Sequence, residues 1–598
     1  MIKYSDFFCK SLKALGYTHC FILQGGSIMH LVNSANKYFK VIPFLHEHSA
    51  TIAAEYFNKR NYSKKNKSWV LVTGGPGLTN SITAVCGAFY ESRELLIVCG
   101  QSKTYDLKLH KINNIRQTGI QQVDNINIIS PVTKFSKTFL KAENFQKIKR
   151  YTSISSENRN GPVFLEIPID IQGRKINENK FKNFPIKNNI IGKKKFLNIK
   201  IKNKIYKLLK KSNKISILLG AGIDKNKFIK LKKKLQKTNF ALFTTWNTAD
   251  YLSEDDKNNF GRPNTWGQRY SNILIQKSDL LISIGSSLGI QQTGFNYKSF
   301  IKNGKIINVD IDEKQLNKKN PKTYLKIKMD ASDFLKNIIE LTDKTIRKKN
   351  LMWISSCKII KNLLPTNEKV NNKTRDSYIS PHDFYFKISK IISDNDNICP
   401  CSSGGAETTF FQAFKFKKKQ NCINNKSLAS MGYGLAGAIG MSLADKKNRT
   451  CLFEGDGGFT QNIQEIGTAI ANNLNIKIFI FYDEGYASIR MTQKNYFNGK
   501  YVGCDEKTGL KFPNWIKFFS SYNVPVARLR KNFDKDKKFL KLFYNRKICG
   551  FIVPIDPEQT YYPKITSKIQ KSGYIISNPL DEMTPALKKE HKNIINRL

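Results

Sequence analysis

Long apolar runs, paired cysteines and acidic residues are all scarce in this sequence of 598 residues. No stretch approaches the roughly 18 consecutive apolar residues that a membrane-spanning helix needs, so we expect no membrane partner. The opening residues, Met1 to Phe7, lack the basic, apolar and small-residue order of a secretory signal. The 11 cysteines are scattered, and a single proline separates the closest two, Cys399 and Cys401, which is a poor zinc spacing. We therefore expect reduced thiols and a cytoplasmic location.

Acidic residues are outnumbered, because 46 Asp and Glu stand against 100 Lys and Arg, for a net charge of +54. A surface with such a charge attracts nucleic acid or anionic lipid. Lys is nevertheless spread along the whole chain with Asn and Ile, which indicates a coding bias. Stretches such as 193–195 and 231–235 are interpreted as solvated faces or linkers. Because no zinc finger or aromatic RNA-binding motif is present, we expect no specific nucleic-acid partner.

Short apolar runs that end in glycine-rich or acidic turns alternate with helical patterns, which is typical of α/β domains with parallel sheets. The hydrophobic fraction of 40% argues against disorder, and the length is sufficient for several domains. Two Lys- and Asn-rich stretches, Arg174 to Lys204 and 343–375, are predicted to be a linker and a helical connector. The predicted strands include His19 to Leu23, Val41 to Leu45, Trp69 to Val72, Leu95 to Val98, Ile215 to Leu219, Ala241 to Thr244, Leu280 to Ile284, Ile306 to Asp310 and Ile476 to Phe481.

One stretch carries the clearest chemistry. The apolar run from Cys451 ends in Gly455-Asp456-Gly457, a helical pattern follows, and the next apolar run stops at Asp483. In a βαβ unit both strand ends lie at the same edge of a parallel sheet, so the two carboxylates are expected close together. Oxygen ligands beside glycines suit a Mg²⁺–phosphate site. The alternative is that both acids are solvated loop residues.

Other turns carry weaker signals. His46 and His48 flank Glu47 and share a face of an extended chain, but no third metal ligand is apparent, so a partly buried acid between hydrogen-bonding histidines is the favoured interpretation. Gly220-Ala221-Gly222 lacks the third glycine of a dinucleotide fingerprint. A structural domain with a vestigial or absent nucleotide site is therefore about as well supported as a domain with a working site. The small-residue helix start after Met431 could pack tightly on a cofactor, but by itself it slightly favours simple helix–sheet packing.

Together these residues resemble the thiamine-diphosphate-dependent enzymes of the acetolactate synthase type, nearly end to end. The family pattern is Gly-Asp-Gly followed by paired Asn; here Tyr482-Asp483 replaces the Asn pair and the expected Gly485-Tyr486 follows. The resemblance implies three doubly wound parallel-sheet α/β domains. We expect the pyrimidine-binding domain at 1–180, the central Rossmann-like, FAD-binding-like domain at 190–342, the diphosphate-binding domain at 376–560, and a C-terminal tail at 561–598.

The resemblance also implies roles for residues at these positions. Glu47 would activate the cofactor, Gln121 would face the reaction centre, and Met431 would hold the cofactor in its bent form. Mg²⁺ would bind Asp456, Asp483 and the backbone oxygen of Gly485. The implied cofactor contacts are Gly25, Gly26, Thr73, Pro76, Asn80, Ser403, Gly404, Met431, Gly432, Gly455, Asp456, Gly457, Gly458, Asp483, Gly485, Tyr486 and Ala487.

The implied reaction is decarboxylation of a 2-oxo acid, pyruvate first, and transfer of the two-carbon unit to a carbonyl acceptor. Acetolactate synthesis is the first choice. The stretches 116–121 and 578–585 look closer to a subgroup found with surface-polysaccharide genes, so a keto-sugar nucleotide is the second acceptor. A catalytically silent binding protein on the same fold is a third hypothesis. The resemblance implies thiamine diphosphate and Mg²⁺, leaves FAD open, and implies a homodimer or homotetramer because the cofactor lies between subunits.

Overall fold

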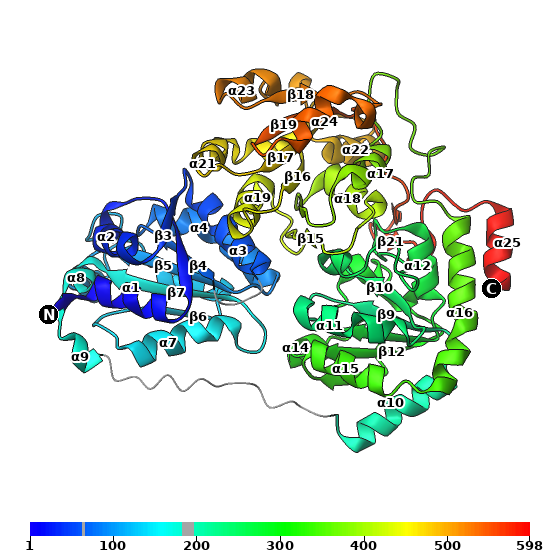
Figure 1. Ribbon diagram of the computed structural model, residues 1–598, viewed down its shortest axis with the longest axis horizontal. Coiled ribbons are helices and arrows are strands. Elements are labelled where there is room, and N and C mark those ends of the chain that lie inside the picture. Colours follow the sequence, from blue (N-terminus) through cyan, green and yellow to red (C-terminus); the bar gives the residue numbers. More distant parts are fainter. Residues whose placement is uncertain (62–65, 182–196) are drawn as a thin grey trace.

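The computed structural model describes residues 1–61, 66–181 and 197–598. Three parallel sheets, each covered by helices, follow one another along the chain, so the predicted fold class is confirmed (Figure 1). The predicted linker from Arg174 to Lys204 and the basic stretch 193–195 lie partly or wholly outside the described residues. In the described ranges no helix is long and apolar enough to cross a membrane.

The N-terminal domain contains a six-stranded parallel sheet with the order β3-β2-β4-β5-β7-β6. The order reverses between β2 and β4, which makes the carboxyl ends of these two strands the place where open α/β sheets bind ligands. The strands are β1 (Ile2–Lys3), β2 (Tyr17–Ile22), β3 (Lys40–Pro43), β4 (Lys67–Val72), β5 (Leu95–Gln101), β6 (Phe135–Thr138), β7 (Pro162–Pro168) and β8 (Lys175–Ile176). The helices are α1 (Tyr4–Ala14), α2 (Met29–Tyr38), α3 (Glu47–Arg60), α4 (Pro76–Tyr90), α5 (Thr104–Asn113), α6 (Asn125–Ile129), α7 (Phe145–Ser153), α8 (Ile169–Gly173) and α9 (Glu178–Phe181).

The central domain contains a five-stranded parallel sheet with the order β10-β9-β11-β12-β13, which reverses between β9 and β11. Its strands are β9 (Ile215–Leu219), β10 (Ala241–Thr244), β11 (Leu280–Ile284), β12 (Lys305–Asp310) and β13 (Leu325–Lys328). Its helices are α10 (Ile199–Lys211), α11 (Lys225–Gln236), α12 (Arg269–Gln276), α13 (Ile290–Thr293), α14 (Glu313–Leu316), α15 (Ala331–Glu340) and α16 (Lys344–Leu363). The predicted helical connector is therefore helical only in its first part.

The C-terminal domain contains a six-stranded parallel sheet with the order β15-β14-β16-β17-β19-β18, which reverses between β14 and β16. Its strands are β14 (Asn397–Pro400), β15 (Asn421–Cys422), β16 (Thr450–Gly455), β17 (Ile476–Tyr482), β18 (Val526–Arg528) and β19 (Cys549–Pro554). Its helices are α17 (Pro381–Ile391), α18 (Gly404–Ala413), α19 (Tyr433–Ala444), α20 (Asp456–Thr460), α21 (Ile466–Ala471), α22 (Ala487–Tyr496), α23 (Trp515–Ser521) and α24 (Lys537–Tyr544).

Helices α3 and α19 lie side by side and join the two outer domains (Figure 1). Gly440 makes this approach possible, because a Cβ atom there would overlap the carbonyl oxygen of Ala53. Tyr56 and Tyr433 pack with ring centroids 6.3 Å apart in the same contact. One buried apolar cluster therefore runs from the N-terminal sheet through both helices to the C-terminal sheet.

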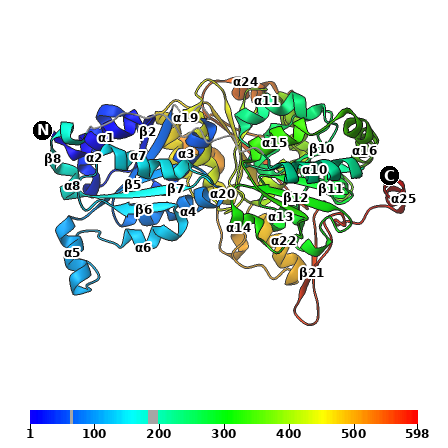
Figure 2. The same cartoon turned by 90° about the horizontal axis from the view of Figure 1, so that it is seen from below.

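The chain after β19 returns to the central domain. The hairpin of β20 (Ser567–Ile569) and β21 (Ile575–Ser577) projects from the body beside α22, and α25 (Lys589–Arg597) ends the chain (Figure 2). Ile565 donates its backbone N–H to the carbonyl of Thr265, and Leu580, Met583 and Ile595 join the apolar cluster of the central domain. The last segment thus packs as part of the central domain's core.

Candidate active site

Glu47 begins α3 at the carboxyl edge of the N-terminal sheet. Its side chain is 5% exposed, and its Oε2 atom accepts a hydrogen bond of 3.0 Å from Nδ2 of Asn80 in α4. Oε1 lies near Gly77, where a Cβ atom would come within 3.5 Å of it. The buried carboxylate is therefore held at one oxygen, and small residues line its other side.

The glycine turns after β2 and β4 meet at the point where the strand order reverses. A Cβ atom at Gly25 would overlap the side chain of Thr73, so glycine is required there for close approach. Gly26 starts the short helix that leads into α2, and Ser27 Oγ lies 2.8 Å from Thr73 Oγ1 and accepts the backbone N–H of Gly74 at 2.8 Å. Pro76 then starts α4. The structure thus brings Gly25, Gly26, Thr73, Pro76 and Asn80 together with Glu47.

Gln121 lies in a loop that packs against the same turn. Gly75 has a φ of +65°, and a Cβ atom there would overlap the carbonyl oxygen of Gln121. The side chain of Gln121 is exposed in this chain, whereas Gln122 is 3% exposed and its Oε1 accepts backbone N–H groups of Thr118 and Gly119 at 3.1 and 2.7 Å. The loop is shaped by Gln122, which sequence reasoning passed over.

Asp456 and Asp483 form the core of a second cluster, at the carboxyl ends of β16 and β17. Asp456 is 1% exposed and Asp483 is 9% exposed. Burial and the neighbouring Asp483 raise the pKa of Asp456 well above its usual range, and burial raises the pKa of Asp483 to about 7, although Arg490 acts in the opposite direction. Backbone N–H groups of Gly457 and Gly485 donate to Asp456. The two carboxyl groups lie close enough to repel each other.

This pair fits a divalent cation. Two buried carboxylates that face each other are costly to ionise without a positive charge between them. Oδ2 of Asp456 is buried and has no hydrogen-bond partner among the described residues. Mg²⁺ typically binds one or two carboxylates and completes its shell with phosphate oxygens and water. Within the described ranges no three His, Cys, Asp or Glu side chains gather into an all-protein metal site, and this includes the neighbourhood of His46 and His48.

The other C-terminal residues singled out above surround this pair. Ser403 and Gly404 begin α18 after β14; Gly404 has a φ of +83° and open space where a Cβ atom would lie. Gly455 also faces open space, Gly458 lies against Glu454, and Gly457 packs against the ring of Tyr486. Ala487 begins α22, and its backbone N–H donates to Asp483. Three neighbouring strand ends therefore place glycine-rich backbone around two carboxylates.

Met431 and Gly432 precede α19 and connect the two clusters. Gly432 caps α19 with a φ of +82°, and its carbonyl oxygen accepts a hydrogen bond of 2.6 Å from Nδ2 of Asn462. The same Nδ2 lies 3.4 Å from Nδ1 of His48, which is the neighbour of Glu47. Glu465 accepts the backbone N–H of Leu45 at 3.2 Å. The C-terminal domain thus holds the segment on which Glu47 lies.

Arg490 is a residue near the site that sequence reasoning missed. It is 5% exposed, its Nη2 atom lies 3.3 Å from Oδ1 of Asp483, and it also donates to the carbonyl oxygens of Asp483 and Glu484. Arg490 therefore fixes the turn after β17 and offsets the charge of Asp483. Asp483 lies in the turn before α22 and Arg490 lies within that helix, so helical periodicity does not relate the two residues, and the signal left in the sequence is their short separation along the chain.

The glycine turns of the central domain pack against each other. The backbone N–H of Gly222 donates to the carbonyl oxygen of Gly285 at 2.9 Å, and a Cβ atom at Gly220 would overlap Gly285. The cavity beside the ends of β11 and β12 measures about 10 Å³. These glycines fit a role in loop packing and present no open cradle for FAD, so no step is derived through FAD.

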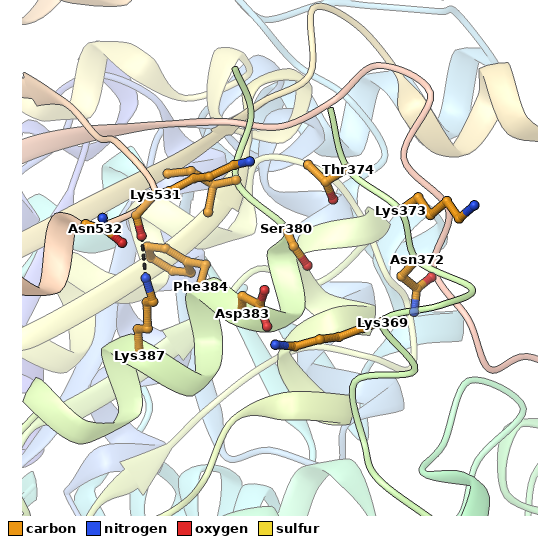
Figure 3. Close-up of a pocket in the computed structure, with 11 residues that line it drawn as sticks. Lys369, Asn372, Lys373, Thr374, Ser380, Asp383, Phe384, Lys387, Lys531 and Asn532 are labelled. Atoms are coloured by element: carbon orange, nitrogen blue, oxygen red, sulfur yellow. Dashed lines mark hydrogen bonds between the residues drawn. The ribbon is translucent and has the colours of Figure 1, made fainter. Parts of the chain in front are cut away.

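A separate cavity of about 320 Å³ opens between α17 and the connector before it, away from both clusters (Figure 3). Lys387 donates to the carbonyl oxygen of Lys531 and pairs with Asp534 at 3.3 Å, while Lys531 pairs with Asp376 at 2.8 Å. The residues that line this cavity include none of the predicted site residues.

Family comparison agrees with this arrangement. Residues 2–128 match the thiamine pyrophosphate enzyme N-terminal TPP-binding domain, residues 203–338 match the central domain, and residues 402–552 match the C-terminal TPP-binding domain. Each match contains one of the three parallel sheets or most of it. The order of the three matches is the order predicted from the motifs.

Individual relatives extend along nearly the whole chain. An acetolactate synthase large subunit of Buchnera aphidicola subsp. Schizaphis graminum is 27% identical over 570 residues, which covers 93% of this chain and 95% of the relative. The chloroplastic acetolactate synthase of Arabidopsis thaliana is 22% identical over 542 residues, covering 89% and 78%, and acetolactate synthase 1 of Zea mays is 22% identical over 539 residues, covering 88% and 82%. The chain therefore belongs to the thiamine-pyrophosphate-dependent enzymes, as an acetolactate synthase-like carboligase and decarboxylase.

Proposed function

We propose that the chain uses thiamine diphosphate and Mg²⁺ to decarboxylate pyruvate and to transfer the two-carbon unit to a second 2-oxo acid, as in acetolactate synthesis. The observation that carries this proposal is that one chain retains both halves of a cofactor site. One half is the buried Glu47, held by Asn80, and the other is the buried pair of Asp456 and Asp483. A silent binding protein on the same fold would have no use for the costly burial of all three carboxylates.

Asp456, Asp483 and the backbone oxygen of Gly485 would bind the metal ion, and glycine-rich backbone after β14 and β16 would contact the diphosphate. Gly404 and Gly455 leave open space there, which supports close approach of a ligand to the backbone. Arg490 would keep Asp483 aimed at the metal. We also propose the domain limits 1–180, 190–342 and 376–560, with the segment 561–598 serving as a cover on the central domain.

Glu47 would hold the proton that activates the cofactor's aminopyrimidine ring. Thiamine diphosphate, when bound, supplies a carbon nucleophile and accepts the electron pair left when carbon dioxide departs. A carboxylate acts as a general acid or base only within hydrogen-bond reach of its partner. Oε1 of Glu47, the oxygen that Asn80 does not hold, lies beside Gly77 and would make this contact. Met431 would pack against the bent cofactor, and Gln121 would face the reacting atoms.

We further propose that two chains complete each site. Glu47 accepts from Asn80 of its own domain, and Asp456 accepts from Gly457 and Gly485, so among the described residues none of these hydrogen bonds joins Glu47 directly to the carboxylate pair. A homodimer or homotetramer would bring Glu47 of one chain to the carboxylate pair of another. All 11 cysteines are free thiols, which supports a reducing compartment such as the cytoplasm.

Substitution of Glu47 tests the proposal directly. We expect Glu47→Gln to abolish carbon dioxide release from pyruvate, because the amide cannot exchange the activating proton, while thiamine diphosphate still binds. Product analysis of the wild-type enzyme with pyruvate, together with calorimetric titration of the cofactor, measures both effects. Glu143→Gln is a matched control, since Glu143 is also 5% exposed but lies outside both clusters. Full activity of Glu47→Gln would refute the assigned role.

A further inference from the structure

Lys564 is a buried cation without a matching anion among the residues that the structure describes. Its side chain is 8% exposed. Nζ donates to Sδ of Met491 at 3.4 Å and lies 5.3 Å from the ring centroid of Trp266 and 5.5 Å from that of Tyr562. An ammonium group has three donors and a thioether is a weak acceptor, so most of the hydrogen-bonding capacity of Lys564 is unused. Burial alone lowers its pKa.

The other buried cations in the described part of the chain have carboxylate or carbonyl partners. Two aromatic faces offset only about 0.5–2 kcal/mol of the cost of burying a charge, whereas that cost is several kcal/mol per ion. Lys564 is therefore held at a cost that its own contacts do not offset. The partners of the others are Glu55 for Arg93, Asp250 for Lys225, Glu368 for Arg269, Asp483 for Arg490, the carbonyls of Phe411 and Phe414 for Arg262, and the carbonyl of Lys547 for Lys477.

Two of the segments around Lys564 lead to the candidate active site, and a third, which carries Trp266, belongs to the central domain. Met491 follows Arg490, which contacts Asp483. On the other side, the ring of Tyr561 packs against Gly405, and the acids Asp483 and Asp456 act on its hydroxyl group. Three residues of extended chain span at most about 10 Å, so Lys564 lies within the length of a small substrate from this ring.

The surroundings of Lys564 allow access from solvent. Trp266, Tyr562 and Met491 are each partly exposed, so the side chains around Nζ reach the surface. The backbone of Lys564 is fixed by paired hydrogen bonds with Thr584, at 3.1 and 2.8 Å. A fixed backbone and flanking rings hold the ammonium group in place before a ligand arrives, which reduces the ordering cost of binding.

We propose that Lys564 binds the anionic group of the acceptor substrate, a carboxylate or a phosphate, with Trp266 and Tyr562 on either side of it. The inference rests on the proposed function, because only a carboligase has an acceptor. A second 2-oxo acid would present its carboxylate to Lys564, and a keto-sugar nucleotide would present its diphosphate. An anion supplies the charge and the acceptor oxygens that the buried ammonium group lacks.

The kinetic test separates acceptors by charge. With pyruvate as donor, we expect Lys564→Met to raise the KM for 2-oxobutanoate as acceptor about ten- to hundredfold, the usual effect of losing a hydrogen bond to a charged group. The KM for acetaldehyde, a neutral acceptor, and carbon dioxide release in a single turnover with enzyme in excess over pyruvate should stay within twofold. Lys564→Arg should retain most of the 2-oxobutanoate affinity. If the phosphate is the ligand, UDP inhibits the wild type and not Lys564→Met. If the KM for 2-oxobutanoate is the same in Lys564→Met and in the wild type, and UDP inhibits both equally, the proposal is overturned.

Thermal unfolding and direct ligand titration test the role of Lys564 independently of enzyme activity. Replacement of an unpaired buried charge by an apolar side chain is neutral or stabilising, so Lys564→Met should keep or raise Tm, whereas Lys225→Met should lower it by leaving Asp250 unpaired. A lower Tm for Lys564→Met with an unchanged acceptor KM would assign Lys564 to the fold. If the wild type releases no carbon dioxide from pyruvate, the proposed function fails. Calorimetric titration with 2-oxobutanoate and with UDP then tests whether Lys564 binds an anion. Equal affinities of the wild type and Lys564→Met would overturn the inference.

Discussion

The charge of Asp483 is offset by the neighbouring Arg490. Asp483 stands where related enzymes usually have Asn, so it adds a negative charge beside Asp456. Arg490, 5% exposed, lies against it and returns the local charge to that of an Asp–Asn pair. Asp and Asn both offer an oxygen atom that can bind a cation. The departure from the family pattern is therefore compensated within eight residues of chain.

Removal of the Asp483 carboxylate should weaken cofactor retention. We expect Asp483→Ala to lower Mg²⁺-dependent affinity for thiamine diphosphate by at least about tenfold, since even indirect partners of a metal ion contribute 10- to 100-fold. Asp483→Asn should retain most of it, because the amide oxygen remains a ligand. Calorimetric titration with and without EDTA measures the effect. Asp376→Ala, at a fully exposed side chain, is the control; normal retention in Asp483→Ala would remove Asp483 from the metal site.

His19 makes stability depend on pH. Burial first, and then Lys40, Lys446 and Lys13, lower the pKa of His19 to about 4, and its ring packs 4.6 Å from that of Phe57. Between pH 6.5 and about 4 the unfolded chain binds a proton that the folded chain does not, so the free energy of unfolding falls as pH is lowered through this window. Urea unfolding at pH 7.5 and 5 should show a smaller loss in His19→Gln, while His591→Gln in α25 should behave as the wild type. An identical loss in His19→Gln would contradict this assignment.

At the scale of elements, the approach of α3 and α19 depends on glycine. Gly440 lies against the carbonyl of Ala53, and Gly437 lies against the ring of Tyr56. The first residue of α3 is Glu47 and the residue that caps α19 is Gly432. The distance between the two helices therefore also sets the distance between the N-terminal and C-terminal clusters.

Gly440→Ala should destabilise the protein although alanine favours helix. We expect a loss of about 1–3 kcal/mol, because the added methyl group meets backbone that cannot move aside. Gly467 of α21 is the control, because a Cβ atom there would lie 3.8 Å from Leu45 and Tyr522, which is an ordinary contact. Gly467→Ala should therefore leave the free energy of unfolding unchanged or raise it by up to about 1 kcal/mol. Thermal unfolding of the two variants compares them directly. Equal Tm changes would mean that α19 can shift away from α3.

At the scale of the whole molecule, a buried polar network joins the three domains. Arg93 of the N-terminal domain pairs with Glu55 and donates to the carbonyl of Asn424 in the C-terminal domain. Glu91 accepts from Asn247 of the central domain at 2.6 Å and from the backbone of Ser427 at 2.7 Å. The domains are thus connected by directional contacts as well as by apolar packing.

Loss of Arg93 should loosen this junction. We expect Arg93→Met to lower the free energy of unfolding by about 3–5 kcal/mol, because Glu55 is left buried and unpaired. The double variant Arg93→Met/Glu55→Gln should recover part of that loss, since the buried charge is removed. Denaturant unfolding of the single and double variants measures the coupling. Additive losses would show that the two side chains do not act as a pair.

Much of the architecture could be predicted because it depends on local patterns. The strands Ile215–Leu219, Ala241–Thr244 and Leu280–Ile284 have the predicted limits, since buried parallel strands are continuous apolar runs bounded by turns. The neighbourhood of Asp456 and Asp483 followed from the βαβ unit. The contact of Glu465 with Leu45 joins residues 420 positions apart, and no local pattern indicates it.

The sequence alone indicated the class of fold and a Mg²⁺–phosphate site, because strand ends, glycine turns and oxygen ligands are encoded within a few residues of one another, and the family resemblance of the same motifs implied the class of cofactor. Only the tertiary structure decided which charges are compensated. Arg490 and Lys564 are both basic residues in a chain with 100 of them, and their sequence neighbours give no reason to separate them. Folding buries both, pairs Arg490 with Asp483 and, within the described ranges, leaves Lys564 without an anion, because burial and pairing depend on how the segments pack in three dimensions.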